Sequence, residues 1–187
     1  MYKKVLVPTD FSSYAHKVQD CLAAIPGIEE IVLLHVLDAR NPKDLEGKGW
    51  SWDSLIDEAR TRLEEQADHL SYRTGKELEI KPILKVIIEP MSGADGVNLQ
   101  RPKPGSGVDL VDVGSVGQAI SRVAAEEMVS LICMGAQGKG LMEGMLLGSV
   151  STEILRQSEA DLTLSWLVTA VMKENRLTSI WEALRKE

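Results

Sequence analysis

The residues best suited to chemistry in this sequence lie in the stretch 134–151, MGAQGKGLMEGMLLGSVS. An apolar run leads into Gly135 and Gly138, and a helix is expected to begin at Gly148 and Ser149. Backbone amides at a helix N-terminus carry partial positive charge and have no partner within the helix. Glycines let the backbone turn tightly and approach a ligand closely. The stretch therefore predicts a loop that binds phosphate or another anion.

Two features of this loop have plain alternatives. The glycines could serve only the turns of an ordinary surface loop, since short glycine patterns also occur without a ligand. The ammonium group of Lys139 could neutralise phosphate charge or remain solvated. The Lys-Ser/Thr pair of a P-loop is missing, and no G-x-G-x-x-G follows the first apolar run. The sequence therefore favours neither a P-loop nor a dinucleotide fingerprint.

Short apolar runs alternate with segments of helical periodicity along the chain. Five runs are expected to form strands: residues 4–8, 30–36, 78–86, 129–134 and 162–168. Helices are expected to begin near Ser12 or Ser13, near Ser51 or Asp53, near Ser115 or Gly117, and at Ser149. Pro82 argues for an edge or irregular position of the third strand. With right-handed crossovers, this alternation predicts an α/β protein with a doubly wound parallel sheet.

Ligands of such sheets bind at the carboxyl ends of the strands, near the point where the strand order reverses. Pro8, Thr9 and Asp10 follow the first predicted strand, and Val36 ends the second. The glycine loop follows the fourth strand, so all these residues are expected at one edge. Asp10 also suits the first turn of a helix, where acidic side chains are favoured, and both roles can hold together.

Residues 87–113 interrupt the alternation with scattered prolines and glycines. The apolar ends of this insertion, 86–88 and 108–113, could pair as an antiparallel ribbon, or the whole insertion could be a disordered loop. Its position suggests a lid or a partner-docking arm. Residues 1–168, insertion included, are expected to form one domain. Residues 169–187 are expected to form a helical extension whose apolar stripe could cover another subunit.

Composition limits the partners. The chain has 187 residues with 21 basic and 28 acidic side chains, and its net charge of -7 opposes binding to nucleic acid or anionic membranes. No apolar run approaches the roughly 20 residues needed to span a bilayer, so a cytoplasmic location is expected. His35 has no second His or Cys at ligand spacing and is expected to be a hydrogen-bonded core residue.

Several motifs together carry a family resemblance. The loop has glycine, two residues, glycine, nine residues, then Gly-Ser, and the segments KKVLVPTDFS and VLLHVLD lie at residues 3–12 and 32–38. On these motifs the chain resembles the nucleotide-binding branch of the universal stress protein family, over about residues 2–86 and 113–160. The resemblance implies a five-stranded, Rossmann-like parallel sheet of the adenine nucleotide alpha hydrolase-like kind. Its strand order would be 3-2-1-4-5, with the inserted arm after the third strand.

The resemblance also implies an adenine nucleotide as the ligand: ATP, or ADP or AMP, accompanied by Mg. Asp10 would accept a hydrogen bond from the adenine amino group, and Val36 would pack beside the base. The expected binding residues are Pro8, Thr9, Asp10, Val36, Met134, Gly135, Gly138, Lys139, Gly148, Ser149, Val150 and Ser151. The ligands of the metal stay unassigned.

Hydrolysis of ATP requires a positioned water, charge neutralisation and a group that orients the nucleophile. The sequence contains no recognisable set of this kind, so no catalytic residue is predicted. The leading hypothesis is a stress-response or signalling module whose bound nucleotide changes its contacts with a protein partner. The alternatives are a slow or partner-activated Mg-dependent ATPase and a nucleotide-free interaction module. A homodimer is expected, although Asp161 and LTLSWLV replace the proline and valines usual in the family's dimer-forming fifth strand.

Overall fold

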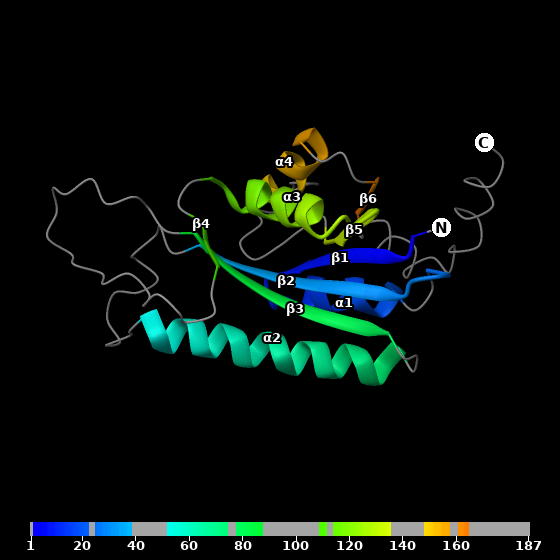
Figure 1. The fold of residues 1–187 in the computed structure, drawn as a ribbon, viewed down its shortest axis with the longest axis horizontal. Coiled ribbons are helices and arrows are strands. Elements are labelled where there is room, and N and C mark those ends of the chain that lie inside the picture. The colour runs from blue at the N-terminus through cyan, green and yellow to red at the C-terminus, as the bar shows by residue number, and fades with distance from the viewer. Residues whose placement is uncertain are drawn as a thin grey trace, which may run out of the picture.

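The computed structural model describes residues 2–22, 25–38, 52–74, 78–87, 109–111, 114–135, 148–157 and 161–164. The strands are β1 (Lys4–Thr9), β2 (Glu30–Asp38), β3 (Glu79–Ile87), β4 (Asp109–Val111), β5 (Leu131–Met134) and β6 (Asp161–Leu164). The helices are α1 (Ser13–Leu22), α2 (Trp52–Thr74), α3 (Val116–Glu126) and α4 (Ser149–Gln157) (Figure 1). The expected C-terminal helix lies outside the described residues.

The six strands form one sheet in the order β4-β3-β2-β1-β5-β6. Every neighbouring pair is parallel. The predicted doubly wound sheet is confirmed, because the five strands expected from the sequence occupy β3-β2-β1-β5-β6, which is the predicted order 3-2-1-4-5. From β1 the chain moves outward through β2 and β3 and then returns to β5 on the other side of β1. The strand order therefore reverses between β1 and β5.

The antiparallel ribbon predicted for the ends of the insertion is wrong. β4 pairs with β3 in parallel, with Lys85 opposite Asp109 and Ile87 opposite Val111. A parallel pair needs a connection of about a dozen residues or more, and residues 88–108 satisfy that length. β4 pairs only with the last three residues of β3, from Lys85 to Ile87. Pro82 precedes them and pairs with β2 but not with β4. Among the described strands, Pro82 therefore lies on an edge stretch, in line with the edge or irregular position expected for it.

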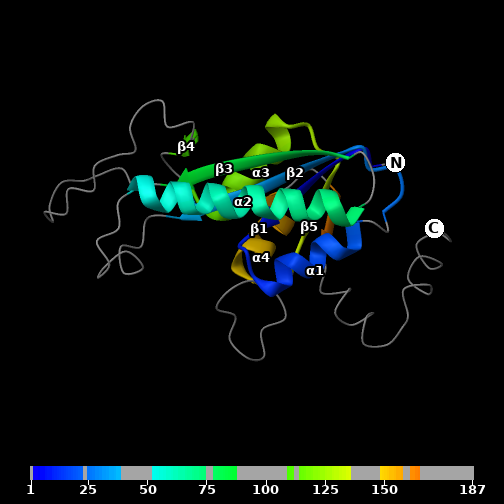
Figure 2. The same ribbon diagram turned by 90° about the horizontal axis from the view of Figure 1, so that it is seen from below.

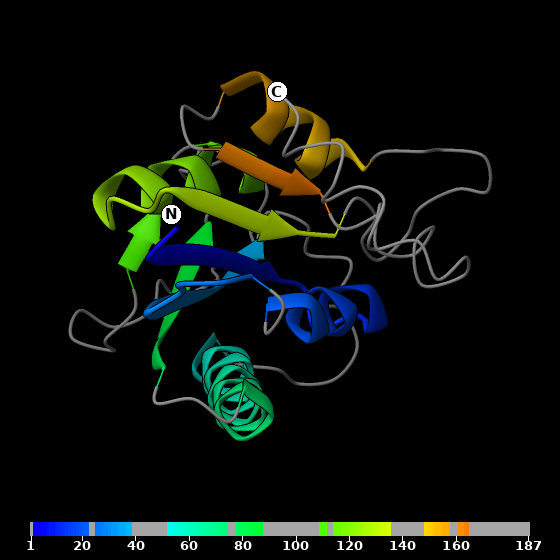
Figure 3. The same cartoon turned by 90° about the vertical axis from the view of Figure 1, so that its right-hand side faces the viewer.

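Helices cover both faces of the sheet. On one face, Val5, Val7, Ile31 and Leu33 form a fully buried cluster with residues of α1 and α2, including Leu70. Figure 2 shows α1 and α2 side by side on this face. On the other face, Leu6, Val32, Leu34 and Ile132 pack against α3 and α4. Viewed end-on, the sheet lies between these two helix pairs (Figure 3). In the parts of the chain that the structure describes, no helix is both long and apolar enough to cross a membrane.

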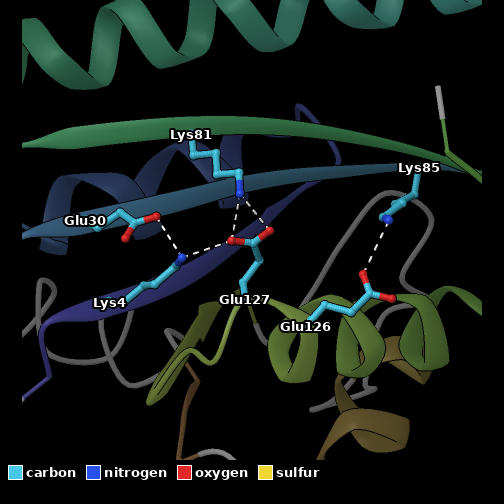
Figure 4. A network of polar contacts seen from close by, with 6 residues as sticks. All are labelled: Lys4, Glu30, Lys81, Lys85, Glu126 and Glu127. Carbon is cyan, nitrogen blue, oxygen red and sulfur yellow. Dashed lines mark hydrogen bonds and ion pairs between the residues drawn. The ribbon is translucent and has the colours of Figure 1, made fainter. Parts of the chain in front are cut away.

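A chain of ion pairs fastens the C-terminus of α3 to the amino edge of the sheet (Figure 4). Glu127 is the C-cap residue of α3. Its carboxylate oxygens form ion pairs with Lys4 Nζ at 2.9 Å and with Lys81 Nζ at 2.8 Å. Lys4 also contacts Glu30 at 2.8 Å. The Glu127 side chain is only 16% exposed, which reduces solvent screening of these contacts. The network therefore joins β1, β2 and β3 to the end of α3, on the edge opposite the predicted site.

The pKa values of this network have opposite shifts. Hydrogen bonds from Lys81 and then from Lys4 hold the pKa of Glu127 below its usual 4.5. Hydrogen bonds to Glu30 and then to Glu127 raise the pKa of Lys4 above its usual 10.5. A carboxyl group with a lowered pKa stabilises the folded state above its unfolded pKa, and this contribution is lost as pH falls through the folded pKa. A lysine with a raised pKa stabilises the folded state below its unfolded pKa. The network therefore stabilises the fold most between the unfolded pKa of Glu127, near 4.5, and that of Lys4, near 10.5.

Replacing Glu127 by Gln is expected to lower the free energy of unfolding at pH 7 by about 1 to 2 kcal/mol, because it removes charged hydrogen bonds from a partly buried group. As the pH falls below 4.5 and then through the lowered pKa of the folded Glu127 carboxyl group, the group becomes protonated and the difference should shrink. Urea denaturation at several pH values measures both effects. The matched control is Glu29→Gln, which breaks the Lys3–Glu29 pair, whose side chains are 68% and 65% exposed. It should cost clearly less than Glu127→Gln, because solvent screens an exposed pair; equal losses would contradict the prediction.

Candidate functional site

The turn between β1 and α1 is held by its own side chains. The Thr9 hydroxyl accepts a hydrogen bond from the Phe11 amide at 3.1 Å. The Asp10 carboxylate accepts one from the Ser12 amide at 2.9 Å. Ser12 caps α1, because its hydroxyl accepts from the Ala15 amide at 3.2 Å. Asp10 is therefore held at the carboxyl end of β1 with one carboxylate oxygen directed toward the turn.

Phe11 occupies the left-handed region of the backbone, with φ of 59°. This conformation costs a non-glycine residue roughly 1 to 2 kcal/mol. The centroids of the Phe11 and His35 rings are 4.3 Å apart. The guanidinium carbon of Arg62 lies over the Phe11 ring, 4.5 Å from its centroid. An aromatic contact and a cation–π contact contribute about 0.5 to 1.5 and 0.5 to 1 kcal/mol, respectively. The two contacts are large enough to offset the backbone strain of the turn.

His35 ties the second strand to the same turn. Its Nδ1 atom lies 2.8 Å from the carbonyl oxygen of Thr9. A carbonyl can only accept a hydrogen bond, so Nδ1 carries the proton and donates it. The hydrogen bond expected for His35 is thus confirmed, whereas the expected core position is not, because the side chain is half-buried. Within the described residues, no group of three His, Cys, Asp or Glu side chains is placed to hold a metal ion.

Three apolar residues of the predicted set share the face of the sheet that α3 and α4 cover. Met134 is 6% exposed and belongs to the cluster on that face, and half-buried Val36 packs against it. Side chains alternate along a strand, so Pro8 lies on the same face as Leu6. Thr9 faces the other side and is 6% exposed, with its hydroxyl used within the turn. Pro8, Val36 and Met134 therefore lie on one face at the ends of three adjacent strands, β2, β1 and β5.

The N-terminus of α4 lies beside the end of β5. The Gly148 carbonyl accepts the first helical hydrogen bond, from the Thr152 amide at 3.0 Å. The Ser151 hydroxyl donates to the Gly135 carbonyl at 3.1 Å, and Ser151 is 3% exposed. The predicted helix Ser149–Gln157 is confirmed. Gly135 and α4 are thus joined directly, although residues 136–147 between them, including Gly138 and Lys139, lie outside the described residues.

Helices α1, α3 and α4 differ in how their N-termini are satisfied. Ser12 caps α1 with its side chain. Ser115 caps α3 by accepting from the Gln118 amide at 3.1 Å, and the Gln118 side chain completes a capping box. α4 follows Gly148, which has no side chain that could accept from the first-turn amides. Helix geometry leaves these amides without partners inside the helix, so α4 presents donors that its cap residue cannot satisfy.

Most of the residues predicted for the site meet at one edge. Pro8, Asp10, Val36, Met134 and Gly135 belong to β1, β2 and β5 or to the turns directly after them. The first turns of α4 add Gly148, Ser149, Val150 and Ser151. Sequence reasoning missed Phe11 and Arg62. Phe11 could have been found as the aromatic residue directly after Asp10. Nothing in the sequence distinguishes Arg62 from the other charged residues expected on the exposed face of α2.

This arrangement defines a class of protein: a doubly wound α/β sheet with polar groups and a helix N-terminus gathered at its reversal point. The model of the Universal stress protein family matches residues 1–165. The chain belongs to this family.

Individual relatives agree. The chain is 30% identical over 169 residues to Universal stress protein MJ0577 of Methanocaldococcus jannaschii, covering 84% of this chain and 91% of that protein. The solved structure of MJ0577 covers 88% of this chain and 95% of its own, with a TM-score of 0.56. The crystal structure of PH0823 matches with 25% identity, the same coverage and a TM-score of 0.60. A universal stress protein from Archaeoglobus fulgidus, solved in complex with dAMP, matches at 18% identity over 87% of this chain and 97% of that one, with a TM-score of 0.53.

The stacked arrangement around Phe11 can be tested on Arg62. Replacing Arg62 by Met keeps the length of the side chain but removes the charge above the ring, and should lower the free energy of unfolding by about 0.5 to 1 kcal/mol. The control is Arg60→Met on the same helix, which pairs with Asp57 at 3.5 Å on an exposed surface. Urea denaturation of both variants makes the comparison. Equal losses in the two variants would show that the guanidinium does not stabilise the turn.

Proposed function

We propose that this chain binds an adenine nucleotide at the carboxyl edge of its sheet, with the base near the end of β1 and the phosphates at the N-terminus of α4. In the bound state it acts as a stress-response or signalling module through contacts with a protein partner. ATP is the first candidate ligand, with ADP and AMP as the shorter forms and Mg as the counter-ion of the phosphates. Because binding does not require the groups that hydrolysis needs, turnover is not part of the proposal.

The observation that carries the proposal is the position of two features at the reversal of the strand order. Asp10 follows β1, and Gly135 follows β5, the strand directly beside it. The crossovers from β1 and β5 lead to opposite sides of the sheet, since α1 lies on one face and α4 on the other (Figure 3). The two connections separate at this point, and ligands of doubly wound sheets bind in the opening that results.

The base half of the proposed site combines a carboxylate with apolar walls. Asp10 can accept a hydrogen bond from an exocyclic amino group such as that of adenine. Val36 is half-buried and β-branched and offers a surface for a flat ring, with Pro8 on the same face. The A. fulgidus protein of the same fold, solved in complex with dAMP, supports adenine as the base.

The phosphate half combines backbone donors with hydroxyl groups. Gly148, which precedes α4, offers no capping side chain to the first-turn amides, and a helix N-terminus favours an anion. The Ser149 side chain is exposed at the start of the helix and can add a hydroxyl donor. Gly138 and Lys139, outside the described residues, are proposed to complete the cradle with close backbone approach and positive charge.

The first test of this proposal is the melting temperature with and without Mg-ATP. A ligand at one hundred times its dissociation constant should add about 2.7 kcal/mol to the free energy of unfolding, which is easily detected. Adenosine, AMP, ADP and GTP in parallel separate the contributions of base and phosphates. If none of the adenine compounds raises the melting temperature, the proposed function is wrong and an interaction module without a nucleotide remains.

The second test is Asp10→Asn. The Asn side chain keeps an oxygen that can accept from the Ser12 amide, so the turn is expected to stay folded. A hydrogen bond to a carboxylate is roughly twice as strong as one to a neutral acceptor, so adenosine and ATP affinity should both fall about tenfold. The control is Asp57→Asn, which removes the same charge from a side chain that is 71% exposed on α2. Calorimetric titration of both variants decides the matter, and an unchanged adenosine affinity in Asp10→Asn would remove Asp10 from the base site.

A further inference from the structure

Helix α4 is fastened to the N-terminus of α3 by one acidic side chain. The Ser115 hydroxyl, which caps α3, also donates a hydrogen bond to the Glu153 carboxylate. Glu153 lies in the second turn of α4, four residues after Ser149. Ser115 therefore serves two helices at once: it accepts from the Gln118 amide of its own helix and donates to α4.

The neighbouring Gly117 makes room for this contact. A Cβ atom placed on buried Gly117 would lie 2.7 Å from the Glu153 Cδ atom and 2.9 Å from its Cγ atom. Both distances are shorter than real Cβ contacts allow, and the three nearest heavy atoms all belong to Glu153. In a helix, alanine is normally preferred to glycine. Glycine at this position is therefore explained by the side chain of Glu153.

The Glu153 carboxylate lies where an anion would bind to α3. Negative charge is favoured within the first turn of a helix, and Ser115 and Gly117 are the cap and the second residue of α3. The N-terminus of α3 is thus already supplied with a carboxylate and a capping box. The N-terminus of α4, which follows a glycine, has no such side chain at its cap position.

α3 provides a fixed support for α4. Its C-terminus is held by Glu127 through Lys4 and Lys81 at the opposite edge of the sheet. At its N-terminus it contacts Glu153. α4 is additionally tied to the end of β5 by the hydrogen bond from Ser151 to the Gly135 carbonyl. The contact with Glu153 therefore links the first turns of α4 to an element that the amino edge holds in place.

From this geometry we propose that Glu153 is a positioning residue for the phosphate half of the site. It holds α4 in the orientation in which the first-turn amides face the phosphates. It also places a carboxylate beside the N-terminus of α3, so that the N-terminus of α4, and not that of α3, binds the phosphates. The inference rests on the proposed nucleotide site. It assigns to Glu153 and Gly117 a role in phosphate affinity and none in binding of the base.

The experiment compares ATP with adenosine, which lacks the phosphates, by calorimetric titration. The variants are Glu153→Ala, Glu153→Gln, Gly117→Ala and the double variant Gly117→Ala/Glu153→Ala, each checked by urea denaturation. Glu153→Ala and Gly117→Ala should each weaken ATP binding about fivefold or more and leave adenosine binding within about twofold. Glu153→Gln keeps an acceptor for the Ser115 hydroxyl and should recover part of the ATP affinity.

The double variant isolates the contact. Since the three heavy atoms nearest to the added Cβ all belong to Glu153, Gly117→Ala should weaken ATP binding in the wild-type background but have no further effect once Glu153 is Ala. Parallel losses of ATP and adenosine affinity would show a merely structural contact and overturn the inference. Unchanged ATP affinity in all variants would do the same. A wild-type chain that binds neither ligand would instead overturn the proposed function itself, and the positioning role with it.

Discussion

The structure depends on the parallel pairing of β1 with β5. Val5 lies opposite Leu131 and Leu6 opposite Ile132, so the two strands end together although more than a hundred residues separate them in the sequence. All strands that follow β1 up to β4 extend the sheet on one side, and β5 and β6 extend it on the other. This single pairing creates the reversal point and brings the turn after β1 next to the start of the glycine loop. The proposed site exists only because of it.

The two edges of the sheet use charge differently. At the amino edge, two lysines and two glutamates neutralise one another in a partly buried network: Lys4, Lys81, Glu30 and Glu127. This network makes the amino edge a structural anchor for α3. At the carboxyl edge, the Ser12 amide donates a hydrogen bond that orients Asp10. α4 follows Gly148 there, and a glycine has no side chain to cap the helix. Charge is paired within a network at the amino edge, whereas at the carboxyl edge the Asp10 carboxylate accepts from the turn beside which the ligand is proposed to bind. The stabilising network and the proposed site therefore lie at opposite edges of the sheet, and α3 runs between them.

Local patterns in the sequence predicted the strands, the helices and the doubly wound sheet, and the family resemblance supplied the strand order and the candidate binding residues. Continuous apolar runs mark strands buried on both faces, and Ser12, Ser115 and Ser149 mark helix starts. The direction of β4 was not predictable, since the same apolar residues suit a parallel or an antiparallel neighbour and the choice depends on the path of residues 88–108. Arg62 and Glu153 were also missed, because each reads as an ordinary charge on a helix surface.

What the sequence by itself determined is thus the set of elements and the residue types at their ends: Asp10 after a strand, and Gly148-Ser149 at the start of a helix. Hydrophobic periodicity and capping preferences act over a few residues, so they can be read locally. Only the tertiary structure decided that Arg62 lies over Phe11 and that Glu153 contacts Ser115, the cap residue of α3. These contacts join residues on different elements. They depend on how helices pack against the sheet, which no local pattern encodes.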